Sequence, residues 1–285
     1  MNASARVLFT VILICGICDA LQNDPFPAGF TMGTLGTVID QEGPSGAQPW
    51  VPAVFYGDSL RFSFAMAGVS YYDAMDNFSD RYAYRTDGGG LAAFNRFVCK
   101  GSVSYFSFLD SYFEQMGYIS FSVNVFPWLR AGTEFRGTRF GIRETDSPAR
   151  TAAGMGFSLW LPWRYAAVSV AGDHIPVKDP GIEGGSSPVV FRAGLHSTEH
   201  RFGAQGVLVE YTPSIYNSLR FSVGEELAIY RDLSLKIAFT NNPVLIGFGI
   251  MFAPSRYALD VSFVNHAVLG WSKGLAASFN PGMRR

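Results

Sequence analysis

The chain has 285 residues, enough for one large domain, and its 22 basic and 23 acidic residues leave a formal charge of −1. No basic stretch is long enough to bind a nucleic-acid backbone, so nucleic acid is excluded as a partner. Charged residues make up 16% of the chain, against roughly 25% in a typical soluble domain. Together with 15% aromatic residues and 31 glycines, this composition favours strands that face lipid on one side and a tight interior on the other.

Residues 1–20 are predicted to be a secretory signal peptide. Arg6 supplies a positive start, Val7–Ile17 forms an apolar core, and small residues lead up to Ala20. The core is too short for a membrane-spanning helix, which needs ~20 residues. We expect cleavage after Ala20. The exported chain then keeps only Cys99 and has no intramolecular disulfide.

A Gly- and Pro-rich segment without a clear period, residues 21–58, separates the signal peptide from a long run of alternating residues, 59–280. In Tyr118–Val125 and Leu233–Thr240, for example, apolar residues on one parity alternate with mostly small or polar residues on the other. This period of two is typical of half-buried strands. We predict fourteen strands, which begin near Leu60, Leu91, Ser102, Met116, Leu129, Ala152, Arg164, Pro188, Phe202, Asn217, Asp232, Pro243, Ser255 and Ala267.

The predicted connections differ in length at the two ends of these strands. Asp73–Gly89, Arg139–Thr151 and Gly172–Ser187 are long, and each follows an odd-numbered strand. The links after even-numbered strands are short. Long loops at one end and tight turns at the other are expected of a bacterial outer-membrane barrel, which closes because lipid offers no partners to open strand edges.

The parity opposite the apolar row carries charged residues, which we predict to face the barrel lumen. They are Arg61, Glu134, Arg136, Arg192, Glu210, Arg220, Glu226, Lys236 and Asp260. A soluble β-sandwich is the alternative fold, but its core would be apolar. The mixed signs predict ion pairs that fill the interior, since a selective pore would more often show one dominant sign.

Short motifs in the second half of the chain resemble the PorV/PorQ group of FadL-like outer-membrane proteins. They include Gly224–Leu227, Leu233–Lys236, Gly247–Ile250, Tyr257–Asp260 and His266–Gly270, and Met32–Thr37 resembles the group's opening segment. The resemblance implies a fourteen-stranded barrel with its N-terminal segment at the periplasmic mouth. It also implies a role with secreted or surface-bound proteins, or in carrying hydrophobic molecules.

No constellation predicts an enzyme, a metal site or a cofactor. His196 and His200 are four residues apart, roughly 13 Å in an extended strand, which is too far for two ligands of one metal. Ser262 and His266 have the same spacing, too long for a nucleophile and its base, and we expect Asn265 and His266 to form a turn. Asp87–Gly90 lacks the Lys-Ser/Thr of a phosphate loop and is predicted to be part of a flexible surface loop.

Two functions therefore remain open. Our main prediction is an accessory of protein export or surface attachment, as the resemblance to the PorV/PorQ group implies. The alternative is a FadL-like passage for small hydrophobic molecules. A packed, salt-bridged interior with partner-binding loops would favour the first function, and an apolar pocket would favour the second.

Overall fold

The computed structural model describes residues 61–71, 83–108, 111–143, 149–178, 189–197, 203–213, 219–254, 256–267 and 270–279. The predicted signal peptide, 1–20, and the predicted N-terminal segment, 21–58, lie outside these ranges. The fourteen strands that the structure describes are β1 (Arg61–Ser70), β2 (Ala83–Phe94), β3 (Phe97–Phe108), β4 (Tyr112–Phe126), β5 (Leu129–Ile142), β6 (Arg150–Pro162), β7 (Ala166–Lys178), β8 (Val190–Ser197), β9 (Ala204–Tyr211), β10 (Leu219–Tyr230), β11 (Leu233–Asn241), β12 (Val244–Phe252), β13 (Tyr257–His266) and β14 (Gly270–Phe279).

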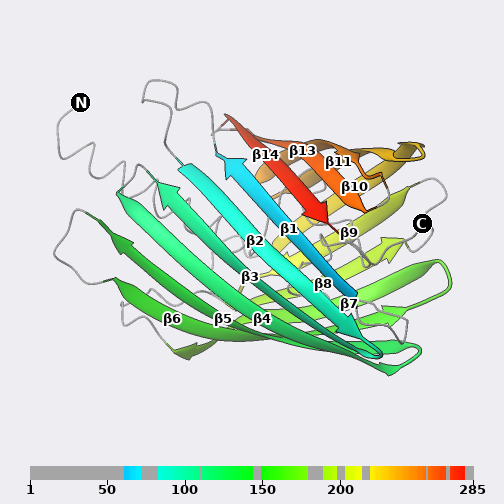
Figure 1. Ribbon diagram of the computed structural model, residues 1–285, viewed down its shortest axis with the longest axis horizontal. Helices are drawn as coiled ribbons and strands as arrows, with labels where there is room; N and C mark the ends of the chain where they lie inside the picture. Colours follow the sequence, from blue (N-terminus) through cyan, green and yellow to red (C-terminus); the bar gives the residue numbers. More distant parts are fainter. Residues whose placement is uncertain are drawn as a thin grey trace.

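Each strand pairs antiparallel with its neighbours in the chain, and β1 pairs with β14 to close the barrel. The closing register places Phe64 opposite Phe279 and Ser70 opposite Lys273. Figure 1 shows β1 to β6 side by side as one inclined wall, with the later strands closing the other side. The predicted all-β, antiparallel barrel of about fourteen strands is confirmed.

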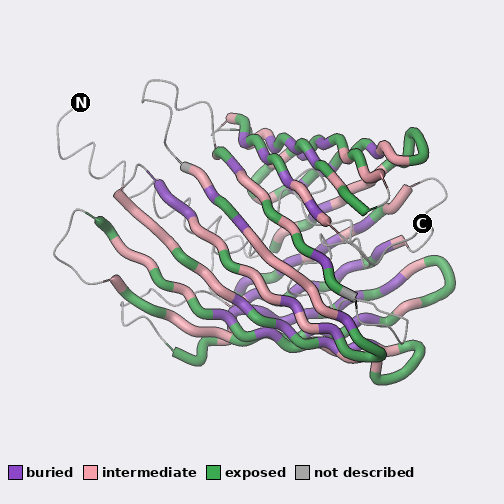
Figure 2. The backbone as a smooth tube through the Cα atoms, viewed as in Figure 1, coloured by how far each residue is buried: buried purple, intermediate pink, exposed green. Residues whose placement is uncertain are grey.

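Burial alternates along the strands, as the colours of the tube in Figure 2 show. On β11, Leu235, Ile237 and Phe239 are exposed on the outer face, whereas the intervening side chains are buried. A barrel surrounded by hydrocarbon places its apolar side chains outward and its small or polar side chains inward, as this one does. Among the described residues, no helix is long and apolar enough to cross a membrane.

The two ends of the barrel differ in the chain that joins the strands. Short turns at one end link β2 to β3, β4 to β5, β6 to β7, β10 to β11 and β12 to β13, and this end also carries the somewhat longer link from β8 to β9. The longest connections, after β1 and β7, lie at the other end. Aromatic side chains gather at the short turns, among them Trp128, Trp163, Tyr230 and Tyr257, all exposed. Such aromatic belts mark a membrane interface. Because outer-membrane barrels place short turns in the periplasm, the end with the longer connections is the extracellular one.

The strands at the extracellular end are longer than the sequence predicted. β2 begins at Ala83 rather than near Leu91, β5 continues to Ile142, and β7 continues to Lys178, so the three long loops are shorter than predicted. The flexible surface loop predicted at Asp87–Gly90 is wrong, because these residues belong to β2. A Cβ at Gly89 would lie 2.7 Å from the Ser102 Cβ, so the glycine lets β2 approach β3 closely.

One turn was also misplaced. Asn265 and His266, predicted to form a turn, are the last two residues of β13 and pair with Trp271 and Gly270 of β14. The two strands therefore stay paired as far as His266. In the sequence, the alternation of apolar and polar residues already ends at Val264, which is apolar on the polar parity.

Candidate functional site

The charged residues predicted to face the lumen lie on the inward-facing parity of their strands. Six of them are buried, namely Glu134, Arg136, Arg192, Glu210, Lys236 and Asp260. Arg220 and Glu226 are half-buried. The side chain of Arg61 lies outside the described part of the structure. The inner face of the barrel is therefore the place to look for a functional site.

Charged side chains on β7 to β10 contact one another in sequence around the wall. Arg192 on β8 forms ion pairs with Asp173 on β7 and with Glu210 on β9, the latter at 2.7 Å between Nε and Oε1. The second oxygen of Glu210 lies 3.4 Å from Nε of Arg220 on β10. One guanidinium thus serves two buried carboxylates, and the attraction between unlike charges offsets part of the cost of burying them.

A second group of contacts lies next to the first and joins β5 to a bulge in β7. Arg136 donates hydrogen bonds to Glu134 and to His174, each at 2.8 Å. The pairing of β6 with β7 shifts between Met155 and Phe157, so two consecutive residues of β7, Asp173 and His174, are both buried. His174 has a φ of 60° there, an uncommon conformation for a residue with a side chain.

Gly156 on β6 provides the space between the two groups of charges. A Cβ at Gly156 would lie 2.7 Å from Oδ1 of Asp173 and 3.0 Å from Cγ of Glu134. The two groups lie side by side on the inner face, and we name them together the charge arc; its members are Glu134, Arg136, Asp173, His174, Arg192, Glu210 and Arg220.

The inner face from β11 round to β1 is different, because most of its side chains are small. We name this set the small-residue lane; it comprises Ser234, Ala238, Thr240, Gly247, Gly249, Ser262, Ser272, Gly274, Ala276, Ser278, Ser63, Ala65 and Ala67. Within it lies one buried ion pair, between Lys236 on β11 and Asp260 on β13. Ser262 also donates a hydrogen bond to Asp260. Gly249 of β12 lies between Lys236 and Ser262 in the ladder, so it leaves room for this contact across the strand.

Among the side chains that the structure describes, the charges on the inner face balance. The buried or half-buried cations are Arg85, Lys100, Arg130, Arg136, Arg192, Arg220 and Lys236, and the anions, equal in number, are Asp87, Glu114, Glu134, Asp173, Glu210, Glu226 and Asp260. A pore that selects ions more often carries a ring of one sign. Among the described residues, the interior therefore offers no basis for selecting cations over anions.

Sequence reasoning missed several members of this interior. Arg85 and Asp87 form a buried ion pair at 2.7 Å on β2, which parity would have found had the strand been predicted to begin at Ala83 instead of near Leu91. Lys100 on β3 is buried and was left out, although it shares the inward parity. Asp173 continues the inward parity of Ser169 and Ala171 but was placed in the predicted loop Gly172–Ser187, and His174 carries no sequence signal because the bulge breaks the period of two.

The histidines and serines singled out in the sequence do not form a reaction centre in the described structure. His196 lies 2.8 Å from the hydroxyl of Ser169 and stacks on Trp160 at 5.2 Å between ring centroids. All three side chains are buried in the wall, where they pack the interior. Ser262 bonds Asp260, and His200 lies outside the described residues. No cluster of three or more metal-ligating side chains occurs in the described ranges.

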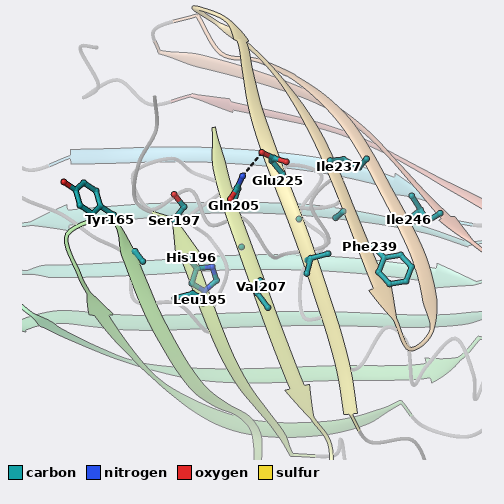
Figure 3. A pocket seen from close by; sticks show the side chains of 15 residues that line it. Tyr165, Leu195, His196, Ser197, Gln205, Val207, Glu225, Ile237, Phe239 and Ile246 are labelled. Atoms are coloured by element: carbon teal, nitrogen blue, oxygen red, sulfur yellow. Dashed lines mark hydrogen bonds between the residues drawn. The ribbon is translucent and has the colours of Figure 1, made fainter. Parts of the chain in front are cut away.

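A hollow of about 620 Å³ lies over β8 to β12. Figure 3 shows Leu195, Val207, Ile237, Phe239 and Ile246 along it. The large lining side chains are those that point outward, so the hollow opens on the outer, lipid-facing wall. Its polar feature is a hydrogen bond of 2.8 Å from the Gln205 amide to the Glu225 carboxylate, drawn as a dashed line in Figure 3.

Comparison with solved structures shows what the barrel is similar to. The toluene transporter TodX of Pseudomonas putida superimposes with a TM-score of 0.61 at 10% identity, over 89% of this chain and 97% of that one. A TodX deltaS2S3 mutant, a monoaromatic hydrocarbon channel, gives 0.58 at 11% identity, over 88% and 99%. Omp33 of Acinetobacter baumannii gives 0.50 at 13% identity, over 79% and 99%.

These likenesses are of fold. No protein-family model matches the chain, and no curated protein matches it. The closed barrel, its apolar outer face and its polar interior place the chain in the bacterial outer membrane, as predicted. The named neighbours are a transporter, a channel and an outer-membrane protein, and none is named as an enzyme.

Proposed function

We propose that this barrel is a passage for small hydrophobic molecules across the outer membrane. The single observation that carries the proposal is the likeness in fold to TodX, named as a toluene transporter, over nearly the whole of both chains. The balanced interior charge supports it, since a passage for uncharged molecules needs no ring of one sign.

The small-residue lane is the wall along which we place the passage. Side chains such as Ser262 and Ala276 occupy little of the lumen, whereas the charge arc fills the opposite side with ion pairs. Ser262 and Ala276 are fully buried in this structure, so passage requires the interior to open along the lane. The charge arc then acts as the fixed side of the barrel.

A second candidate function is that of an accessory to protein export or surface attachment. Two observations favour it: the PorV/PorQ-like motifs of the sequence, and the salt-bridged interior on β5 to β10. In that case the activity would lie in the extracellular loops. The segment open to replacement is shorter than Arg139–Thr151, because the ends of that range belong to β5 and β6.

The experiment compares two neighbouring alanines on β14. Ala276 belongs to the lane and points inward, whereas Ala277 lies on the outward parity. A tryptophan at each position therefore adds the same volume to opposite faces of the strand. Uptake of toluene would be measured in cells or vesicles that hold the barrel, with heat-modifiable gel mobility as the check on folding.

We expect the wild type and Ala277→Trp to increase uptake and Ala276→Trp to abolish most of that increase. A wild-type barrel that gives no increase over empty vesicles would refute the passage. Equal uptake by the two variants would refute the lane as its route. If uptake is absent, and replacing residues 144–148 with a Gly-Ser link stops capture of surface proteins, the role in export or surface attachment is the correct one and the passage is not.

A further inference from the structure

A polar row crosses the outer face of β2 to β6 near their extracellular ends. Thr86, Tyr105, Gln115, Arg139 and Thr151 pair successively, each with the next, on five adjacent strands. All five lie on the parity that elsewhere faces lipid. Figure 1 shows these strands as neighbours in one wall, so the row is continuous across it.

Three cations of this region point away from the lumen and are exposed. Arg139 on β5 lies over the ring of Phe113 at 6.0 Å, and Arg143, just beyond β5, donates a hydrogen bond to the Tyr105 hydroxyl. Lys178 at the end of β7 donates to the Thr151 hydroxyl at 3.0 Å. We name Arg139, Arg143 and Lys178 the basic band.

The acidic residues of the same wall lie on its other face. In the described parts of β2 to β7 and their connections, the acidic side chains are inward-facing ones, namely Asp87, Glu114, Glu134 and Asp173. Glu114 lies near the extracellular end of β4. It faces the interior, where it interacts with the charges of Arg85 and Arg136. The outer face of this wall therefore presents positive charge that no described carboxylate on that face neutralises.

The height of the basic band matches a membrane interface. The outward row of β5 is apolar at Phe135, and Arg139 follows four residues later, roughly 13 Å further along the strand. On β4, the same change occurs between Ile119 and Gln115. The apolar belt ends there, at the extracellular side, where lipid headgroups begin.

We propose that the basic band binds the phosphate groups of an outer-leaflet glycolipid of the lipid A type. Arginine and lysine are the side chains that best pair with phosphate, and the Gln115 amide and Thr151 hydroxyl beside them can donate further hydrogen bonds. The acyl chains of such a lipid would lie on the apolar rows directly below. This site is on the outer wall and does not depend on the proposed passage.

The test is titration of the purified barrel in detergent with lipid A, followed by native mass spectrometry. The variant is Arg139→Gln/Arg143→Gln/Lys178→Gln. Its matched control is Arg96→Gln/Arg231→Gln/Arg256→Gln, which removes the same charge from exposed positions at the short-turn end. Heat-modifiable mobility shows whether each variant keeps its barrel.

We expect the band variant to lose affinity for lipid A by about tenfold or more, because each charge-assisted hydrogen bond contributes on that scale. The control variant should bind as the wild type does. Enzymatically dephosphorylated lipid A should bind the wild type as weakly as intact lipid A binds the band variant. Equal binding of the two lipids, or equal losses in both variants, would overturn the proposal. Inorganic phosphate that displaced lipid A at equal concentration would also overturn it, since the bound group would then be the free ion.

Discussion

The charge arc and the small-residue lane face each other across one lumen and are held in different ways. In the arc, Arg192 has two carboxylate partners on two neighbouring strands, and Glu210 joins it to a second arginine. In the lane, Lys236 and Asp260 form one pair among serines, alanines and glycines. Both walls are polar, but the side chains of the arc link several neighbouring strands, whereas in the lane a single ion pair joins β11 to β13.

This difference suggests that the two walls have different roles, one rigid and one able to move. A wall whose charges depend on one another resists local change, because moving one member exposes another to a medium of low dielectric. A wall of small side chains has few contacts to break. The arc is therefore suited to hold the cross-section of the barrel, and the lane is suited to give way.

The most sensitive position in this comparison is Arg192. Replacing it with methionine leaves Asp173 and Glu210 buried without their shared cation, at a cost of about 3–5 kcal/mol in the free energy of unfolding. Lys236→Met leaves one carboxylate, which keeps its hydrogen bond from Ser262, so its cost should be smaller. Urea unfolding in lipid vesicles measures both. If Lys236→Met proves as costly as Arg192→Met, the arc is no more interdependent than the lane.

The next effect compares the outer face of the barrel with its inner face. Ile237 is exposed to lipid on β11, so Ile237→Arg should cost roughly 2–4 kcal/mol if the site lies near the bilayer midplane. Ser122 faces inward on β4, where a change to threonine keeps a hydroxyl and should be mild. The same unfolding measurement applies. Similar losses at the two positions would contradict the assignment of faces, which also rests on Phe121, Val123, Phe239, Val261 and Phe263.

Much of this fold could be predicted from the sequence because a period of two is a direct consequence of strand geometry. Where one row is apolar and the other polar, as on β11 and β13, strand and face were both predicted. The prediction was wrong where glycines remove the apolar row, as at Gly88–Gly90 on β2. A glycine signals a turn or a close approach of two strands equally well, and only the neighbouring strand decides between them.

The interior site was predictable as a set of residues but not as a set of contacts. Parity predicted Arg192 and Glu210 on the inner face, whereas the partnership of Arg192 with Asp173 depends on the register of β7 with β8. A bulge adds one residue and inverts the parity that follows it, so no regular pattern reveals His174, whereas Asp173 keeps the inward parity of β7 and was missed because it was placed in a loop. The basic band was missed for a related reason. Arg139 was placed in a loop, where an outward-facing row has no meaning.

The smallest effect concerns how tightly the lane itself is packed, and two glycines in strands measure it. A Cβ at Gly249 would lie 2.8 Å from the Ser262 hydroxyl, which donates to Asp260, so Gly249→Ala must displace that hydroxyl and weaken the one ion pair of the lane. A Cβ at Gly137, on the outer face of β5, would meet nothing within 4 Å.

Overpacking of a closed interior costs typically about 1–3 kcal/mol, and the cost at Gly249 should fall at the lower end because a single hydroxyl has to move. Gly137→Ala should change the free energy of unfolding by less than about 0.5 kcal/mol, since nothing opposes the added methyl group. Both variants would be unfolded in urea beside the wild type. If Gly249→Ala costs no more than Gly137→Ala, the side chains around Asp260 are loosely packed. The Lys236–Asp260 pair then does not depend on the space that Gly249 leaves.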